Sequence, residues 1–122
     1  MALKSSIEAF LATRIDSIES LEALLLLFGG GSQSLTTRKT AETIGISQEA
    51  AERALLALCE SGLAELDGTG FRYAPADPKD ASTTAELARE YQSRRAEMIN
   101  AIYTGNLERL RQFADAFRLR KR

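Results

Sequence analysis

Histidine is absent from this chain, and cysteine occurs only once, as Cys59. Histidine is the commonest general base near neutral pH and the commonest side-chain ligand of metal ions, so its absence argues against both roles. A single cysteine forms no intrachain disulfide and no thiolate metal cluster. Because Cys59 follows Leu58 near the end of an expected helix, we interpret it as a packing residue; a redox-sensitive thiol is the alternative.

The sequence motifs of catalysis are missing as well. There is no nucleophile–base pair and no pair of carboxylates placed by a motif. The glycines at positions 29–31 lack the following Lys-Ser/Thr of a phosphate-binding loop. We therefore expect a protein that is not an enzyme and that binds no cofactor and no metal.

Long apolar runs and a strong net charge are also lacking. The longest apolar run, residues 23–28, is far shorter than the roughly 20 residues that a bilayer span needs, and residues 1–13 do not resemble a signal peptide. We expect a cytoplasmic protein without membrane contact. The formal net charge of −1 hides an uneven distribution, since residues 1–79 hold 7 basic and 11 acidic side chains and residues 80–122 hold 9 basic and 6 acidic.

With 122 residues, of which 44% are apolar, the chain is long enough for one domain with one core. Leu3, Ile7 and Leu11 recur at helical spacing and predict a first helix. A capping box of Asp16 and Glu19 predicts a second helix over residues 17–28, apolar on all sides from position 23 onward, which must be buried from several directions.

The middle of the chain alternates helix caps and glycines. Thr36 or Thr37 caps a third helix that ends at Gly45, and Ser47 caps a fourth that ends at Gly62. Alternating residues on both sides of the turn at 67–70 predict a β-hairpin. The fold class is mainly α with a small β-hairpin.

The remaining residues predict two more helices. We read the residues around Pro75 and Pro78 as a linker, and a capping box of Thr83 and Glu86 as the start of a helix over residues 85–104. Gly105 then ends that helix, and Asn106 caps a last one. The last helix carries a second terminal apolar stripe, made of Leu110, Phe113 and Phe117, before a basic end at residues 118–122.

Three short segments together resemble bacterial winged helix-turn-helix regulators, and the layout is most similar to the MarR-like group. They are Leu35-Thr36-Thr37 through Ala41, Ile44-Gly45-Ile46-Ser47, and Ala54-Leu55 through Leu58 to Gly62-Leu63. The resemblance covers residues 18–73, about half of the chain. It implies a winged-helix core at 17–75 with flanking helices at 1–15 and 83–119, all in one domain of residues 1–122.

The resemblance also implies a DNA-binding transcriptional regulator. In such proteins the second helix of the motif enters the major groove and the hairpin touches the neighbouring backbone. Base-facing positions here are Gln48, Glu52 and Arg53, with Glu49, Ala50 and Ala57 beside them. Backbone-facing positions are Thr37, Arg38, Lys39 and Arg72, with Thr69 in the turn of the hairpin.

The chemistry of these residues leaves two functions open. Arg53 suits guanine and Gln48 suits adenine, and a glutamate such as Glu52 can accept a hydrogen bond from cytosine. Against DNA stands the acidity of the reading helix, because a like-charge contact at about 4 Å costs on the order of 1 kcal/mol even in water. Arg53 can instead pair with Glu49 one turn earlier, and Arg38, Lys39 and Arg72 can be ordinary solvated cations.

The alternative function is protein binding through the same acidic helix. Leu56 lies outside the inward stripe of that helix, so either a flanking helix covers it, which we favour, or it belongs to a docking surface. The two terminal apolar stripes must also be buried, either against each other or across a two-fold axis. We predict a homodimer formed through the terminal helices, which also supplies the two reading helices that a palindromic DNA site needs.

Overall fold

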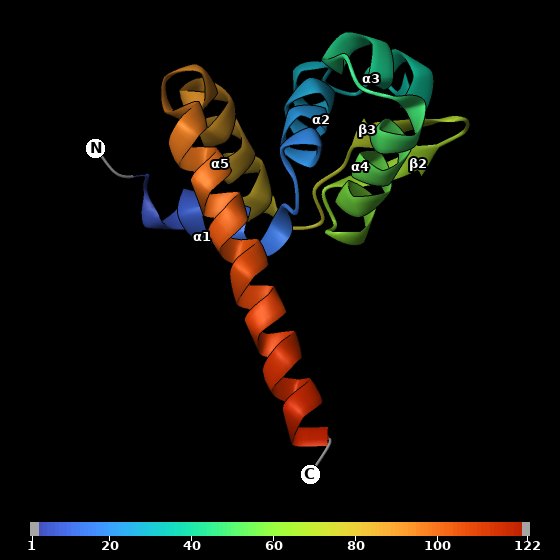
Figure 1. Ribbon diagram of the computed structural model, residues 1–122. Helices are drawn as coiled ribbons and strands as arrows, with labels where there is room; N and C mark the ends of the chain where they lie inside the picture. Colours follow the sequence, from blue (N-terminus) through green and yellow to red (C-terminus); the bar gives the residue numbers. More distant parts are fainter. Residues whose placement is uncertain (1–2, 121–122) are drawn as a thin grey trace.

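The computed structural model describes residues 3–120, which are mainly helical with a small antiparallel sheet (Figure 1). The chain begins with helices α1 (Ser5–Arg14) and α2 (Ile18–Gly29). The next elements are strand β1 (Leu35–Thr36), helices α3 (Thr37–Ile44) and α4 (Gln48–Glu60), strands β2 (Ala64–Asp67) and β3 (Gly70–Tyr73), and helix α5 (Pro78–Arg120). A mainly helical chain with a β-hairpin is thus confirmed.

Hydroxyl caps start three of the helices. The side chain of Ser17 accepts a hydrogen bond from the Ser20 N–H, so Ser17, and not the expected Asp16, caps α2. Thr36 accepts from the Lys39 N–H at the start of α3, and Ser47 accepts from the Ala50 N–H at the start of α4. Each cap satisfies a backbone donor that the first helical turn leaves without a partner.

A left-handed glycine separates α3 from α4. Gly45 has a φ of 85° and a ψ of 39°, a conformation in which a Cβ atom is strained. Its N–H donates to the Ala41 carbonyl, which closes α3, and only two residues then precede α4. The tight turn predicted from the sequence is confirmed at this position.

The sheet has one strand more than the sequence predicted. β2 and β3 form the expected hairpin, and β1 pairs with the other edge of β3, which gives the order β1-β3-β2. Leu35 lies opposite Phe71 in this register. A strand of two residues is too short to show an alternating pattern, which is why the sequence did not reveal it.

The core joins the two sides of the molecule through α2. Figure 1 shows α2 between α5 on one side and α3, α4 and the sheet on the other. Leu21, Leu24 and Leu27 of α2 have no exposed surface, and no side chain from Ala23 to Phe28 is exposed beyond an intermediate level. The prediction that this segment is buried from several sides is confirmed.

α5 starts earlier than the sequence predicted. The capping box at Thr83 and Glu86 was wrong, because the helix begins at Pro78, directly after Asp77. The Asp77 carboxylate accepts a hydrogen bond from the Lys79 N–H at 2.9 Å. Proline is favoured at the first helical position, where no N–H donor is needed, so residues read as a linker belong to the helix.

α5 consists of two parts that meet at Arg94. This residue has non-helical backbone angles (φ −129°, ψ 27°), and Figure 1 shows the chain turning back there. The expected break at Gly105, with Asn106 as a new cap, was therefore wrong. The Asn106 side chain instead donates to the Asp16 carbonyl at 2.9 Å.

Gly105 is needed for close helix packing and not for helix termination. It lies against α1, and a methyl group in its place would overlap the backbone of Ala12. Arg109, one turn further on, donates to the Ala12 carbonyl. A glycine inside a helix lowers helix propensity, and here the close approach of the two backbones accounts for it.

The two terminal apolar stripes have different environments. In α1, Ile7 and Leu11 are fully buried, and Leu3 just before the helix is 8% exposed. In the second part of α5, Leu110 and Phe113 are 64% and 72% exposed, although their spacing is equally regular. Residues 121 and 122 of the expected basic end lie outside the described residues. Between residues 3 and 120, no helix is both long and apolar enough to cross a lipid bilayer.

Candidate nucleic-acid interface

The predicted contact residues lie on three neighbouring elements. Thr37, Arg38 and Lys39 form the first turn of α3, Gln48, Glu52 and Arg53 lie on α4, and Arg72 lies on β3. All except Thr37 and Arg72 are exposed, and those two are half-buried. Figure 1 shows α3, α4 and the hairpin on the side of the molecule away from α1 and α5. The structure thus leaves this region accessible.

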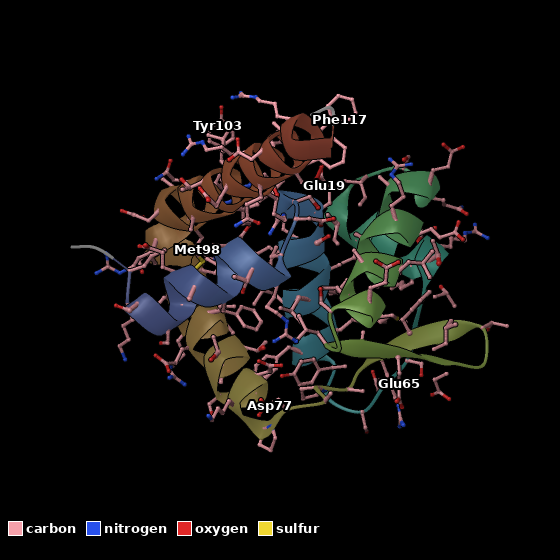
Figure 2. The ribbon with its side chains drawn as sticks, turned by 90° about the horizontal axis from the view of Figure 1, so that it is seen from below. Glu19, Glu65, Asp77, Met98, Tyr103 and Phe117 are labelled. Atoms are coloured by element: carbon pink, nitrogen blue, oxygen red, sulfur yellow. The ribbon has the colours of Figure 1, made fainter. Side chains whose placement is uncertain are left out.

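Two of the four cations in this region already have acidic partners. The Arg38 Nε lies 3.2 Å from Glu42 Oε1, one helical turn away. The Arg72 Nε donates to Glu65 at 2.8 Å, and these two residues face each other in the β2–β3 register. The hydrogen bond that Arg72 donates to Glu65 raises the pKa of Arg72, and the negative charge of Glu65 adds to this effect. Figure 2 shows Glu65 at the outer side of the hairpin.

Lys39 and Arg53 form no ion pair with any residue between 3 and 120. The alternative pairing of Arg53 with Glu49 is therefore not formed. Arg53 lines a surface hollow of about 230 Å³ together with Asp16 and Glu19 from the start of α2. Arg53 is exposed, and the other charged residues that line this hollow are both acidic.

The outward face of α4 is acidic and partly apolar. Glu49, Glu52 and Glu60 are exposed, and Leu56 between them is 42% exposed. The expectation that a flanking helix covers Leu56 was wrong, because this side chain is 42% exposed. A leucine ringed by glutamates suits contact with a basic, partly apolar partner.

Thr40 and Cys59 are structural in this arrangement. Thr40 is fully buried, and its hydroxyl donates to the Thr36 carbonyl at 2.9 Å. Burial, and secondarily the charge of Glu65, raises the pKa of the Cys59 thiol. A raised pKa disfavours the thiolate, which is the reactive form of cysteine.

The sequence did not predict the ion pair that anchors this region to the rest of the molecule. Arg14, at the end of α1, donates to Asp80 Oδ1 at 3.1 Å, and its other terminal nitrogen lies 2.9 Å from Asp80 Oδ2. Arg14 also donates to the Ser61 carbonyl at the end of α4, and the Ser61 hydroxyl donates back to the Arg14 carbonyl at 2.9 Å. These bonds tie α1, α4 and α5 together.

Two of the three ion pairs in and around this region follow from local sequence patterns, and the third does not. The spacing of Arg38 and Glu42 is the favourable i,i+4 spacing, and the hairpin register places Arg72 opposite Glu65, so both pairs were accessible to sequence reasoning. Arg14 and Asp80 are 66 residues apart, and no local pattern connects them.

Comparison with known proteins adds no relative. No protein-family model matches the chain, and no curated protein matches its sequence.

Proposed function

We propose that residues 17–75 form a winged helix-turn-helix and that the protein is a DNA-binding transcriptional regulator acting as a homodimer. The observation that carries the proposal is the order and pairing of the elements. A helix and a short strand precede two helices joined at a left-handed glycine, and a hairpin follows whose inner strand pairs with the first strand. Winged helices use this arrangement to present the second helix of the pair to the major groove.

Each predicted contact has a role in this proposal. Gln48, at the start of α4, and Arg53, near its middle, face adenine and guanine edges, and Glu52 accepts from a cytosine amino group. Lys39 and the N-terminal end of α3, including Thr37, contact a phosphate, since helix N-termini attract anions. Arg38 and Arg72 reach the backbone when they exchange Glu42 and Glu65 for phosphate oxygens.

The charges of the region set an expectation for affinity. Of the four cations in this region, only Lys39 and Arg53 form no ion pair with another described residue. With about three phosphate-facing cations per copy, which are Arg38, Lys39 and Arg72, a single copy binds weakly, and two copies give a salt dependence with a slope of roughly −5 on logarithmic axes. The proposed function therefore requires two copies on one duplex.

A second candidate function is supported by the exposure of Leu56. In this candidate, α4 docks onto a basic protein through Glu49, Glu52, Glu60 and Leu56. The ion pairs of Arg38 and Arg72 support it too, because they remove positive charge from the surface that DNA would approach. Reversing the charges of Glu49 and Glu52 should strengthen binding to DNA but weaken binding to a basic protein.

The deciding experiment is a fluorescence-anisotropy titration of duplex DNA with the full chain, in a series of salt concentrations. We expect binding at low salt that is lost in the double variant Arg38→Glu, Lys39→Glu and strengthened in Glu49→Lys, Glu52→Lys. The matched control is the double variant Lys79→Glu, Arg89→Glu, which also reverses one lysine and one arginine but on the first part of α5. It should retain most of the affinity for DNA. No binding by the unmodified chain at the lowest salt would refute DNA binding and leave protein docking as the candidate.

A further inference from the structure

The second part of α5 (residues 95–120) carries a stripe of exposed apolar side chains. Tyr103 is 61% exposed, Leu110 64%, Phe113 72% and Phe117 51%. Figure 2 shows Tyr103 and Phe117 on the side of this helix away from α1, whereas Met98 lies near α1. α1 therefore leaves the stripe uncovered, and Figure 1 shows the end of α5 projecting past the rest of the molecule.

The spacing of the stripe follows a heptad pattern. Steps of four, three, four and three residues connect its members, which are Tyr103, Leu107, Leu110, Ala114 and Phe117. All five are exposed. This alternation keeps one narrow line of side chains on one face of a helix, as in the contact line of a two-stranded coiled coil. Phe113, which is 72% exposed, lies beside this line of five residues.

We infer that this heptad stripe binds the same stripe of a second copy of the chain, and that the two helices run parallel. Leu107 and Ala114 then occupy the a positions, and Tyr103, Leu110 and Phe117 occupy the d positions. α1 takes no part, because its own apolar stripe is already buried within one chain. The sequence predicted a dimer formed through both terminal helices, and we now infer one formed through α5 alone.

The residues beside the stripe favour the parallel orientation. Arg111 and Arg118 occupy the e positions, and Asn106 and Phe113 occupy the g positions. An antiparallel pair brings e positions of the two helices together and places arginine against arginine. A parallel pair places Arg111 beside the partner's Asn106 and Arg118 beside the partner's Phe113, where a guanidinium stacks on an aromatic ring.

This inference deepens the proposed function and rests on it only in supplying the second copy that DNA binding needs. Pairing through α5 leaves α3 and the hairpin free in both copies, because these elements lie on the other side of α2, whereas the end of α4 shares a hollow with Arg109 of α5. The pairing itself is measured without DNA. Loss of DNA binding in a protein that still pairs would thus overturn the proposed function alone.

The first test is sedimentation equilibrium of the full chain over a range of concentrations. We expect twice the chain mass of 13.4 kDa at the higher concentrations. Leu110→Asp should weaken association about 100-fold or more, because it places two carboxylates in the apolar contact line. Gln112→Asp is the matched control, since position 112 is exposed but outside the stripe. Equal circular dichroism spectra for the two variants exclude a folding defect.

The second test measures orientation with cysteines. In a Cys59→Ser background, Leu107→Cys and Ala114→Cys should each form a disulfide-linked dimer under mild oxidation, since a parallel pair places each a position beside itself. Gln112→Cys should pair as well but should form no disulfide-linked dimer. Cross-linking of only one of the two stripe cysteines would overturn the parallel arrangement.

A membrane surface is the competing partner for a helix with arginines beside phenylalanines. It is tested by co-sedimentation of the full chain with vesicles of phosphatidylcholine and phosphatidylserine. We expect no binding by the dimer. A chain that remains at 13.4 kDa at every concentration, or that binds vesicles through Phe113 and Phe117, would overturn the inference.

Discussion

The stripe before and within α1 and the stripe at the end of α5 look alike in the sequence, yet the structure treats them in opposite ways. Ile7 and Leu11 are fully buried under the rest of the chain, whereas Leu110 and Phe113 are mostly exposed. Apolar periodicity therefore predicts that a helix face seeks burial, and it does not say which surface buries it. The apolar side chains of α1 are buried by the same chain, whereas those near the end of α5 are exposed.

Backbone packing explains the difference. α1 lies against α5 where Gly105 allows the two backbones to approach closely, and Arg14 holds its end to Asp80 and Ser61. The last turns of α5 project past α1, as Figure 1 shows. The chain has no further segment within residues 3–120 to cover that part of the helix.

The largest effect is expected from placing a charge in each stripe. Ile7→Asp should lower the free energy of unfolding by about 4 kcal/mol or more, because it buries a carboxylate without a partner. Phe113→Asp, the matched variant in the exposed stripe, should change it by less than about 1 kcal/mol at concentrations where the chain is monomeric. Urea denaturation monitored by circular dichroism measures both. Similar losses in the two variants would show that the end of α5 folds back on its own chain.

A smaller effect is expected from the ion pair that fixes the end of α1. Arg14→Met should destabilise the chain by roughly 2–4 kcal/mol, because it leaves the Asp80 carboxylate buried without its cation. Arg38→Met breaks the exposed pair with Glu42 and should cost less than about 1 kcal/mol. Thermal unfolding compares the two. Equal costs would mean that Arg14 does not anchor α1.

The smallest effect is expected at the helix contact itself. Gly105→Ala should cost roughly 1–3 kcal/mol, because the new methyl group meets the backbone of Ala12. Gly29→Ala is the control, since a Cβ there has no neighbour within 4 Å and the substitution should stabilise the chain by up to about 1 kcal/mol. Calorimetry of both variants measures these changes in the free energy of unfolding. A neutral Gly105→Ala would show that α1 and α5 are less closely packed than described.

The sequence predicted those parts of the fold that local chemistry determines. Ser47 and Gly45 were identified from the hydroxyl that caps a helix start and from the residue type that adopts a positive φ. The hairpin followed from alternation around a glycine-rich turn. In each case the interaction partners lie within a few residues of one another.

The errors concern features that distant partners decide. A glycine after a helical pattern reads as a stop, but Gly105 is fixed by Ala12, more than ninety residues earlier in the chain. Leu56 was expected to be covered by a flanking helix, but the structure leaves it 42% exposed. The sequence predicted the individual residues of the candidate site. It did not predict that Arg38 and Arg72 pair with Glu42 and Glu65.

Hydrogen–deuterium exchange of the unmodified chain at low and high protein concentration tests the contrast between the two stripes most directly. We predict slow exchange in α1 at both protein concentrations. Over residues 106–118 we predict slow exchange only at the high protein concentration, where two copies pair. Equally fast exchange over residues 106–118 at both concentrations would contradict this prediction, and so would equally slow exchange.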